Sequence, residues 1–191
     1  MEAEEIKESI KKASRELFRH YGYKKTSVTE IAKKAKIAKA TIYKYFESKE
    51  LVLHAILMDY IRESVEELIR NPSNETTQEA YLSKLILRVS RLTYTICNEF
   101  IGWDFIRESA NAQEYLKTLS DDLENLLILS FMESEVIDPN IPPENLRFLI
   151  KASKSIVFSF AFTAVSVADV RKYFISFQKE LLPYLVKATV I

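Results

Sequence analysis

The chain has 191 residues, of which 48% are hydrophobic and 28% charged, so it can bury a core and does not have the composition of a disordered protein. Its two glycines, Gly22 and Gly102, lie far apart, whereas a phosphate-binding loop needs at least two within a few residues; P-loop and dinucleotide-binding enzymes are therefore excluded, and hairpin-rich β folds are disfavoured. The 27 basic residues balance the 27 acidic ones, but residues 11–49 hold twelve Lys or Arg against three acids, a net charge of +9 that leaves −9 for the rest. This asymmetry predicts that one part of the chain binds a polyanion.

The single cysteine, Cys97, excludes an intramolecular disulfide and a cysteine-rich zinc site, and it indicates a reducing compartment. Residues 1–5 are acidic where a secretory signal would be basic and then apolar. The longest uncharged run, 155–168, is too short to cross a bilayer. We therefore predict a soluble cytoplasmic protein.

Three helices are predicted in the basic segment. Apolar residues at helical spacing, starting at Ile6, are followed by Gly22 in the position of a left-handed C-terminal cap. Ser27 and Glu30 have the spacing of a capping box, in which each side chain bonds the backbone N–H of the other residue. A turn over residues 36–38 then separates two short helices. The three helices are expected to end at about Tyr21, Ala35 and Tyr45.

Further helices are predicted along the rest of the chain. Ser48 would cap a helix that reaches Arg70, and a linker over 71–74 would precede a second capping box at Thr76 and Glu79. The later helices are expected over 82–100, 115–127, 144–168 and 169–188, with breaks at 109–112 and 138–143 and a kink at Pro183.

These elements predict an all-α protein of about nine helices, with no convincing strand. We expect residues 1–47 to form a DNA-binding domain of three helices. Residues 48–191 are expected to form a larger helical bundle for ligand binding and dimerisation, joined to the first domain by the helix over 48–70.

Two short helices joined by a three-residue turn have the form of a helix-turn-helix DNA reader. The sequence over about 6–55 resembles the N-terminal domain of TetR-family transcriptional regulators. The residues that carry this resemblance are Ala13, Leu17, Phe18, Gly22, Thr26, Ser27, Ile31, Ala32, Ala35, Ile37, Thr41, Ile42, Tyr43, Tyr45, Phe46, Ser48, Lys49, Glu50 and Leu51.

Candidate DNA-binding residues fall into two groups. The residue types themselves point to Lys36, Lys39 and Lys44 as cations that reach phosphates or guanine edges, and to Thr41 as a contact to a phosphate or a thymine methyl. The resemblance implies that Lys39, Ala40 and Lys44 lie near the bases, and that a second set holds the DNA backbone: Thr26 or Ser27, Tyr43, Tyr45 and Lys49.

The sequence departs from the family pattern at three positions of the turn and the third helix. Lys36 and Ala40 stand where the family often has glycine, and Ala38 stands where serine often caps the helix. Small residues at Ala32, Ala35 and Ala40 are expected where helices approach closely. The core of the three-helix unit is predicted to contain Ile31, Ile37, Ile42, Phe46 and Leu51.

The C-terminal part offers aromatic residues that could line an effector cavity, although each could equally be ordinary core: Tyr94, Phe100, Trp103, Phe105, Phe158 and Phe162. His20 and His54 lack metal-ligand spacing, and no metal, cofactor or catalytic residue is predicted.

Three functional hypotheses remain at this point. The first is a homodimeric repressor, paired through its two C-terminal helices, that binds a palindromic operator on double-stranded DNA and is released by a small apolar effector. The second is a DNA-binding dimer without an effector pocket. The third is a helical enzyme with a cationic substrate face, against which stands the lack of a nucleophile with a base at useful spacing.

Overall fold

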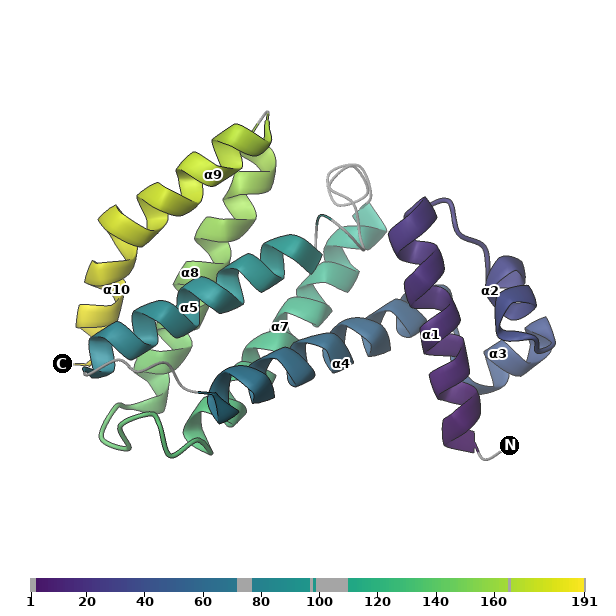
Figure 1. The fold of residues 1–191 in the computed structure, drawn as a ribbon, viewed down its shortest axis with the longest axis horizontal. Coiled ribbons are helices and arrows are strands. Elements are labelled where there is room, and N and C mark those ends of the chain that lie inside the picture. Colours follow the sequence, from purple (N-terminus) through teal and green to yellow (C-terminus); the bar gives the residue numbers. More distant parts are fainter. Residues whose placement is uncertain (1–2, 72–76, 97, 99–109, 165, 191) are drawn as a thin grey trace. The chain divides into compact units, whose positions relative to one another are not determined.

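The computed structural model describes residues 3–71, 77–96, 98, 110–164 and 166–190 (Figure 1). These residues form helices and turns and contain no strand, as the sequence predicts. None of the helices in this part of the chain is both long and apolar enough to cross a membrane. The helices are α1 (Ala3–Tyr21), α2 (Val28–Ala35), α3 (Lys39–Tyr45), α4 (Lys49–Arg70), α5 (Gln78–Ile96), α7 (Ala110–Met132), α8 (Pro143–Thr163), α9 (Val167–Ser176), the π-helical turn η2 (Phe177–Leu181) and α10 (Leu182–Thr189).

The chain divides into two compact units. The first comprises residues 1–60 and 95–119, and the second comprises 61–94 and 120–191. The division falls inside α4 and inside α7, so each of these helices contributes to both units.

The first unit contains the predicted three-helix arrangement, in which α2 packs against both α1 and α3 (Figure 1). Its core includes Ile10, Phe18, Ile31 and Ile42, all buried. Two details of the prediction are wrong. Leu51 is 45% exposed, because Val52 and Leu53 occupy the inward face of α4 instead, and Ala40 lies on the surface rather than at a helix contact.

Local signals in this unit act as the sequence predicts. Gly22 ends α1 at a φ of 82°, and its N–H donates to the carbonyl oxygen of Phe18 at 2.9 Å. The hydroxyl of Ser27 accepts the N–H of Glu30, while the carboxylate of Glu30 accepts the N–H of Ser27 at 2.7 Å. These contacts fix the start of α2 relative to the end of α1.

The turn between α2 and α3 depends on Lys36, which has left-handed backbone angles, φ 56° and ψ 40°. Its N–H donates to Lys33 and the N–H of Ile37 donates to Ala32, which is the hydrogen-bond pattern of a Schellman motif. The conformation is the one that glycine adopts without cost, so the lysine that stands at this position is strained.

Replacing Lys36 with glycine is expected to raise the free energy of unfolding by about 1 kcal/mol, because a left-handed conformation costs a residue with a Cβ about that much. Urea unfolding followed by circular dichroism measures the change. Lys33→Gly, in the last turn of α2, is the matched control and should lower the stability, since glycine weakens a regular helix. If both variants lose stability, the strain at Lys36 is not real.

Two predicted helix starts are shifted. The N-cap of α5 is Thr77, whose hydroxyl accepts the N–H of Ala80 at 3.2 Å, and not Thr76. The predicted break over 109–112 is wrong, because α7 already begins at Ala110. The predicted helix over 82–100 is described as far as Ile96, and its end near Gly102 lies outside the described residues.

The two long C-terminal helices are predicted with the wrong boundary. α8 ends at Thr163, and α9 begins after Ser166, whose hydroxyl accepts the N–H of Asp169 in a second capping box. Pro183 has no N–H to donate, and a π-helical turn precedes it, in which the N–H of Leu182 donates to Phe177. The Asn145 amide of α8 donates to the Thr189 carbonyl at 3.1 Å, so α10 returns along α8 (Figure 1).

Candidate nucleic-acid interface and effector cavity

Helix α3 presents most of the predicted DNA-binding residues on the surface of the first unit. Lys36, Lys39, Ala40 and Lys44 are exposed. Tyr43 is also exposed, whereas Thr41 and Tyr45 are half-buried. The helix is seven residues long and has no side-chain cap at Ala38, so its first N–H groups are not used by a cap. The face therefore offers the ammonium groups of its lysines to phosphates.

Two tyrosine rings accompany the lysines of α3. The ammonium of Lys39 lies 5.9 Å from the centre of the Tyr43 ring, and that of Lys44 lies 5.9 Å from the centre of the Tyr45 ring. Contacts at this distance are weak cation–π interactions, which restrict where a long lysine side chain points. The arrangement limits the directions in which both ammonium groups can reach.

Of the two alternatives at the start of α2, Thr26 is 2% exposed and Ser27 is on the surface. The Thr26 hydroxyl donates to the Gly22 carbonyl at 3.0 Å, so this side chain closes the loop between α1 and α2 from inside. A direct DNA contact by the Thr26 side chain does not fit this position. Ser27 is accessible, although its hydroxyl already takes part in the capping box.

Lys49, the first residue of α4, is held inside the first unit rather than extended into solvent. Its ammonium donates to the carbonyl oxygens of Tyr23 and Thr26, both at 2.9 Å, and lies 4.1 Å from the centre of the Tyr23 ring. Burial lowers the pKa of Lys49, against the opposing effect of the carboxylates of Glu50 and Glu30. The Tyr23 hydroxyl donates to Glu50 at 2.6 Å. The start of α4 therefore makes three hydrogen bonds to the loop between α1 and α2, two through Lys49 and one through Glu50.

Other cations of the basic segment are paired within the unit. Lys34 of α2 forms an ion pair with Glu16 of α1 at 2.7 Å, and Lys11 of α1 pairs with Asp59 of α4 at 2.6 Å. These pairs join helices to one another. The positive charge of α3 itself is left facing outward, which separates structural lysines from candidate DNA contacts.

The predicted effector residues do not form one site in the described part of the chain. Phe100, Trp103 and Phe105, and the side chain of Phe162, lie outside the described residues. Tyr94 packs edge-on against Phe174 of α9, with ring centres 5.8 Å apart. The second unit has a mostly aliphatic cavity, which neither Tyr94 nor Phe158 lines.

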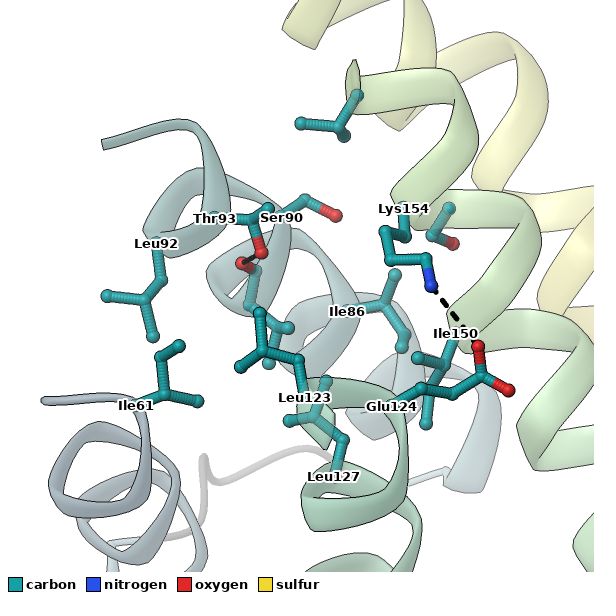
Figure 2. A pocket seen from close by; sticks show the side chains of 13 residues that line it. Ile61, Ile86, Ser90, Leu92, Thr93, Leu123, Glu124, Leu127, Ile150 and Lys154 are labelled. Atoms are coloured by element: carbon teal, nitrogen blue, oxygen red, sulfur yellow. Dashed lines mark hydrogen bonds and ion pairs between the residues drawn. The ribbon is translucent and has the colours of Figure 1, made fainter. Parts of the chain in front are cut away.

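That cavity lies among α4, α5, α7 and α8 and has a volume of about 30 Å³, well below the roughly 300–1,000 Å³ of a typical ligand pocket (Figure 2). Its wall is mostly aliphatic and comes from Ile61, Ile86, Val89, Leu92, Leu123, Leu127, Ile150 and Val157. The polar groups in the wall are Ser90, Thr93, Glu124, Ser153 and Lys154.

Glu124 of α7 is a nearly buried carboxylate in this wall. It accepts hydrogen bonds from Lys154 at 3.2 Å and from Arg147 at 3.1 Å, both on α8 (Figure 2 shows the bond to Lys154). Burial would raise the pKa of Glu124, but the hydrogen bonds and charges of the two cations outweigh it and lower the pKa. One carboxylate thus faces two cations.

Sequence reasoning missed this cavity because it selected aromatic residues. A usable signal was present, since Glu124 lies three, four and seven residues before Leu127, Ile128 and Phe131, on one apolar helix face. A carboxylate in such a position needs a buried partner. The partner on α8 could be named only from the packing of α7 on α8.

Comparison with known proteins finds a protein family whose model matches the basic segment. Residues 10–56 match the family model "Bacterial regulatory proteins, tetR family". An uncharacterised HTH-type transcriptional regulator of Bacillus subtilis, YuxN, is 37% identical over 70 residues. That match covers 36% of this chain and 24% of YuxN, so the chain matches about a quarter of the length of this relative.

Solved structures match over nearly the whole chain. A TetR-family regulator of Mesorhizobium loti has a TM-score of 0.64 at 18% identity, covering 100% of this chain and 97% of its own. The repressor AlkX of a Dietzia species, implicated in biodegradation of n-alkanes, scores 0.60 at 16% identity and covers 95% of each chain. FadR of Bacillus subtilis, in complex with stearoyl-CoA, scores 0.52 at 19% identity, covering 95% of this chain and 98% of its own. At identities this low, the structural similarity shows the fold alone.

Proposed function

Since the chain belongs, through residues 10–56, to the tetR family of bacterial regulatory proteins, we propose that it is a homodimeric transcriptional repressor released from its operator by a small effector. The observation that carries this proposal is the outward, cationic face of α3 on a helix-turn-helix whose turn is closed by Lys36. The proposal places the protein in the cytoplasm and gives it no enzymatic activity. It divides the chain into a DNA-binding part, 1–47, and a ligand-binding and dimerisation part, 48–191.

In this proposal α3 enters the major groove. Lys39, Ala40 and Lys44 face the bases, while Ser27, Lys36, Thr41, Tyr43 and Tyr45 hold the phosphates. Binding of the full chain to duplex DNA should weaken steeply as salt rises, and palindromic sites should be selected from a random pool. A flat salt dependence, or no preference for any palindrome, would contradict the proposal.

Replacing Lys44 with methionine is expected to change which sequences are selected, because a lysine near a guanine edge contributes about 1–3 kcal/mol of discrimination. Selection from a random duplex pool followed by sequencing measures the change. Lys172→Met, an exposed lysine of α9, is the control and should leave the selected sequences unaltered. An unchanged preference in the Lys44 variant would remove this residue from base reading.

Dimerisation is supported by an outward face on α8, α9 and α10. On α8, Phe148, Ala152, Ser155 and Ser159 follow one another at helical spacing, and none of the four is fully buried. The hydroxyls of the two serines donate to backbone carbonyls of α8 itself, so a partner helix can pack on them without leaving a donor unpaired. Ile175, Leu181 and Tyr184 add exposed apolar surface from α9 to α10. Two copies could bury these faces as a four-helix interface.

The effector half of the proposal is supported by the cavity in the second unit. Ile61, in its wall, lies on α4, the helix whose first residue, Lys49, bonds the α1–α2 loop of the DNA-binding part. A ligand that widens the cavity and moves Ile61 would act on the helix whose first residues contact the α1–α2 loop. A dimer without any effector is the competing candidate, and the small cavity volume is the observation in its favour.

A further inference from the structure

The cavity wall contains a buried hydroxyl that none of the described residues bonds. Ser153 of α8 is 2% exposed, lines the cavity, and its Oγ makes no hydrogen bond within the described residues. A buried hydroxyl without a partner costs free energy, and such groups are uncommon in folded proteins. The group is therefore available to a ligand that brings an acceptor.

The next residue, Lys154, supplies a cation in the same wall. Its ammonium donates to Glu124 at 3.2 Å and to the carbonyl of Ser120 at 3.5 Å, the second contact being at the limit of a hydrogen bond. Glu124 keeps a second cation, Arg147 at 3.1 Å, if Lys154 turns away. Lys154 can therefore move to a new acceptor without leaving a nearly buried carboxylate unpaired.

Charge and polarity in this wall select among ligand types. Glu124, Arg147 and Lys154 together carry one excess positive charge, so an anion would neutralise the cluster. A cationic ligand would compete with Lys154 for Glu124, and a neutral hydrocarbon would leave the Ser153 hydroxyl unpartnered. A carboxylate is acceptor-only and can take a bond from both Ser153 and Lys154.

We propose that the effector is a small aliphatic carboxylate, whose carboxylate binds the Ser153 hydroxyl and the Lys154 ammonium and whose chain lies among the aliphatic side chains of the wall. This inference rests on the proposed effector-responsive function and specifies its ligand. The cavity volume of about 30 Å³ is too small for an aliphatic chain, so the chain of the ligand enters by spreading α4, α5, α7 and α8.

Titration calorimetry of the full chain without DNA tests the proposal, with octanoate as the probe and octanol and octylamine as the neutral and cationic controls. Octanoate is expected to bind with a stoichiometry of one per subunit and at least about 10-fold more tightly than either control, the lower end of what a hydrogen bond to a charged group contributes. Equal binding of octanol and octanoate, or no binding of octanoate, overturns the proposal.

Two variants make the test specific. Ser153→Ala removes a hydroxyl with no partner among the described residues, so the variant should fold as well as the parent and bind octanoate about 10-fold more weakly. Lys154→Met should also weaken octanoate while leaving octanol unchanged. Unaltered octanoate binding in Ser153→Ala would contradict the assigned site. Salt-dependent DNA binding is measured on the same samples. A chain that binds DNA but not octanoate contradicts the proposed effector and leaves the proposed DNA-binding function standing.

Discussion

A chain carrying both Ser159→Glu and Tyr184→Glu is expected to be monomeric and to bind a palindromic duplex at least about 100-fold more weakly than the parent. Both positions lie on the outward face of α8 to α10, and Tyr184 is 75% exposed. Pairing two copies would bring four added carboxylates into one apolar interface, where unpaired charges are strongly unfavourable. Tethering two DNA-reading units multiplies affinity by about 10²–10⁴, and a monomer loses that gain.

Light scattering gives the oligomeric state, and titration of labelled duplex gives the affinity. Leu129→Glu is the matched control, because Leu129 is an exposed apolar residue, at 58%, on α7 rather than on the proposed interface. It should remain dimeric. Far-UV circular dichroism confirms that each variant is folded. A double variant that stays dimeric, or a control that dissociates, would show that the dimer uses another face.

The parts of the fold that the sequence predicted well are set by interactions between residues close in the chain. Gly22 ends α1, and Ser27 with Glu30 begins α2, because each signal acts within one helical turn. The turn at Lys36 was predicted from its length and place. Its left-handed backbone ends α2 and lets the chain turn into α3 three residues later, and here a lysine adopts it.

The predicted helix boundaries are wrong where a capping or breaking signal lies within a long apolar pattern. The helical period continues on both sides of the capping box at Ser166 and Asp169, so the periodicity predicts an end of α8 at residue 168, five residues beyond Thr163. The π-helical turn before Pro183 was expected only as a kink, since the missing N–H does not reveal which pattern replaces the lost bond.

Tertiary contacts account for the part of the site that could not be predicted. The buried position of Lys49 depends on two carbonyl groups of the α1–α2 loop, 23 and 26 residues earlier in the chain. The cavity needs side chains from four helices, and its polar wall depends on Lys154 of α8 meeting Glu124 of α7. Neither arrangement leaves a periodic signal in the sequence.

Replacing Lys49 with methionine is expected to weaken binding to every DNA sequence by about 10-fold without changing the salt dependence. The ammonium already donates to Tyr23 and Thr26, so it positions the loop before α2 and does not take a phosphate. Loss of two charge-assisted bonds should also lower the free energy of unfolding by about 2 kcal/mol. A residue that neutralises a phosphate instead reduces the slope of log affinity against log salt by about 0.9.

The slope of log affinity against log salt therefore separates the two roles for Lys49, and Lys36→Met, which replaces an exposed lysine of the turn, is the comparison. Its slope should fall by about 0.9 while stability is unchanged. Lys49→Arg keeps the charge and the donors, so it should recover most of the lost affinity. If Lys49→Met lowers the slope of log affinity against log salt and keeps the parent's stability, the residue binds a phosphate directly. The bonds from Lys49 to the α1–α2 loop then do not contribute to DNA binding. If the slope holds and stability falls, α4 transmits its position to the DNA-reading helices through this one ammonium group.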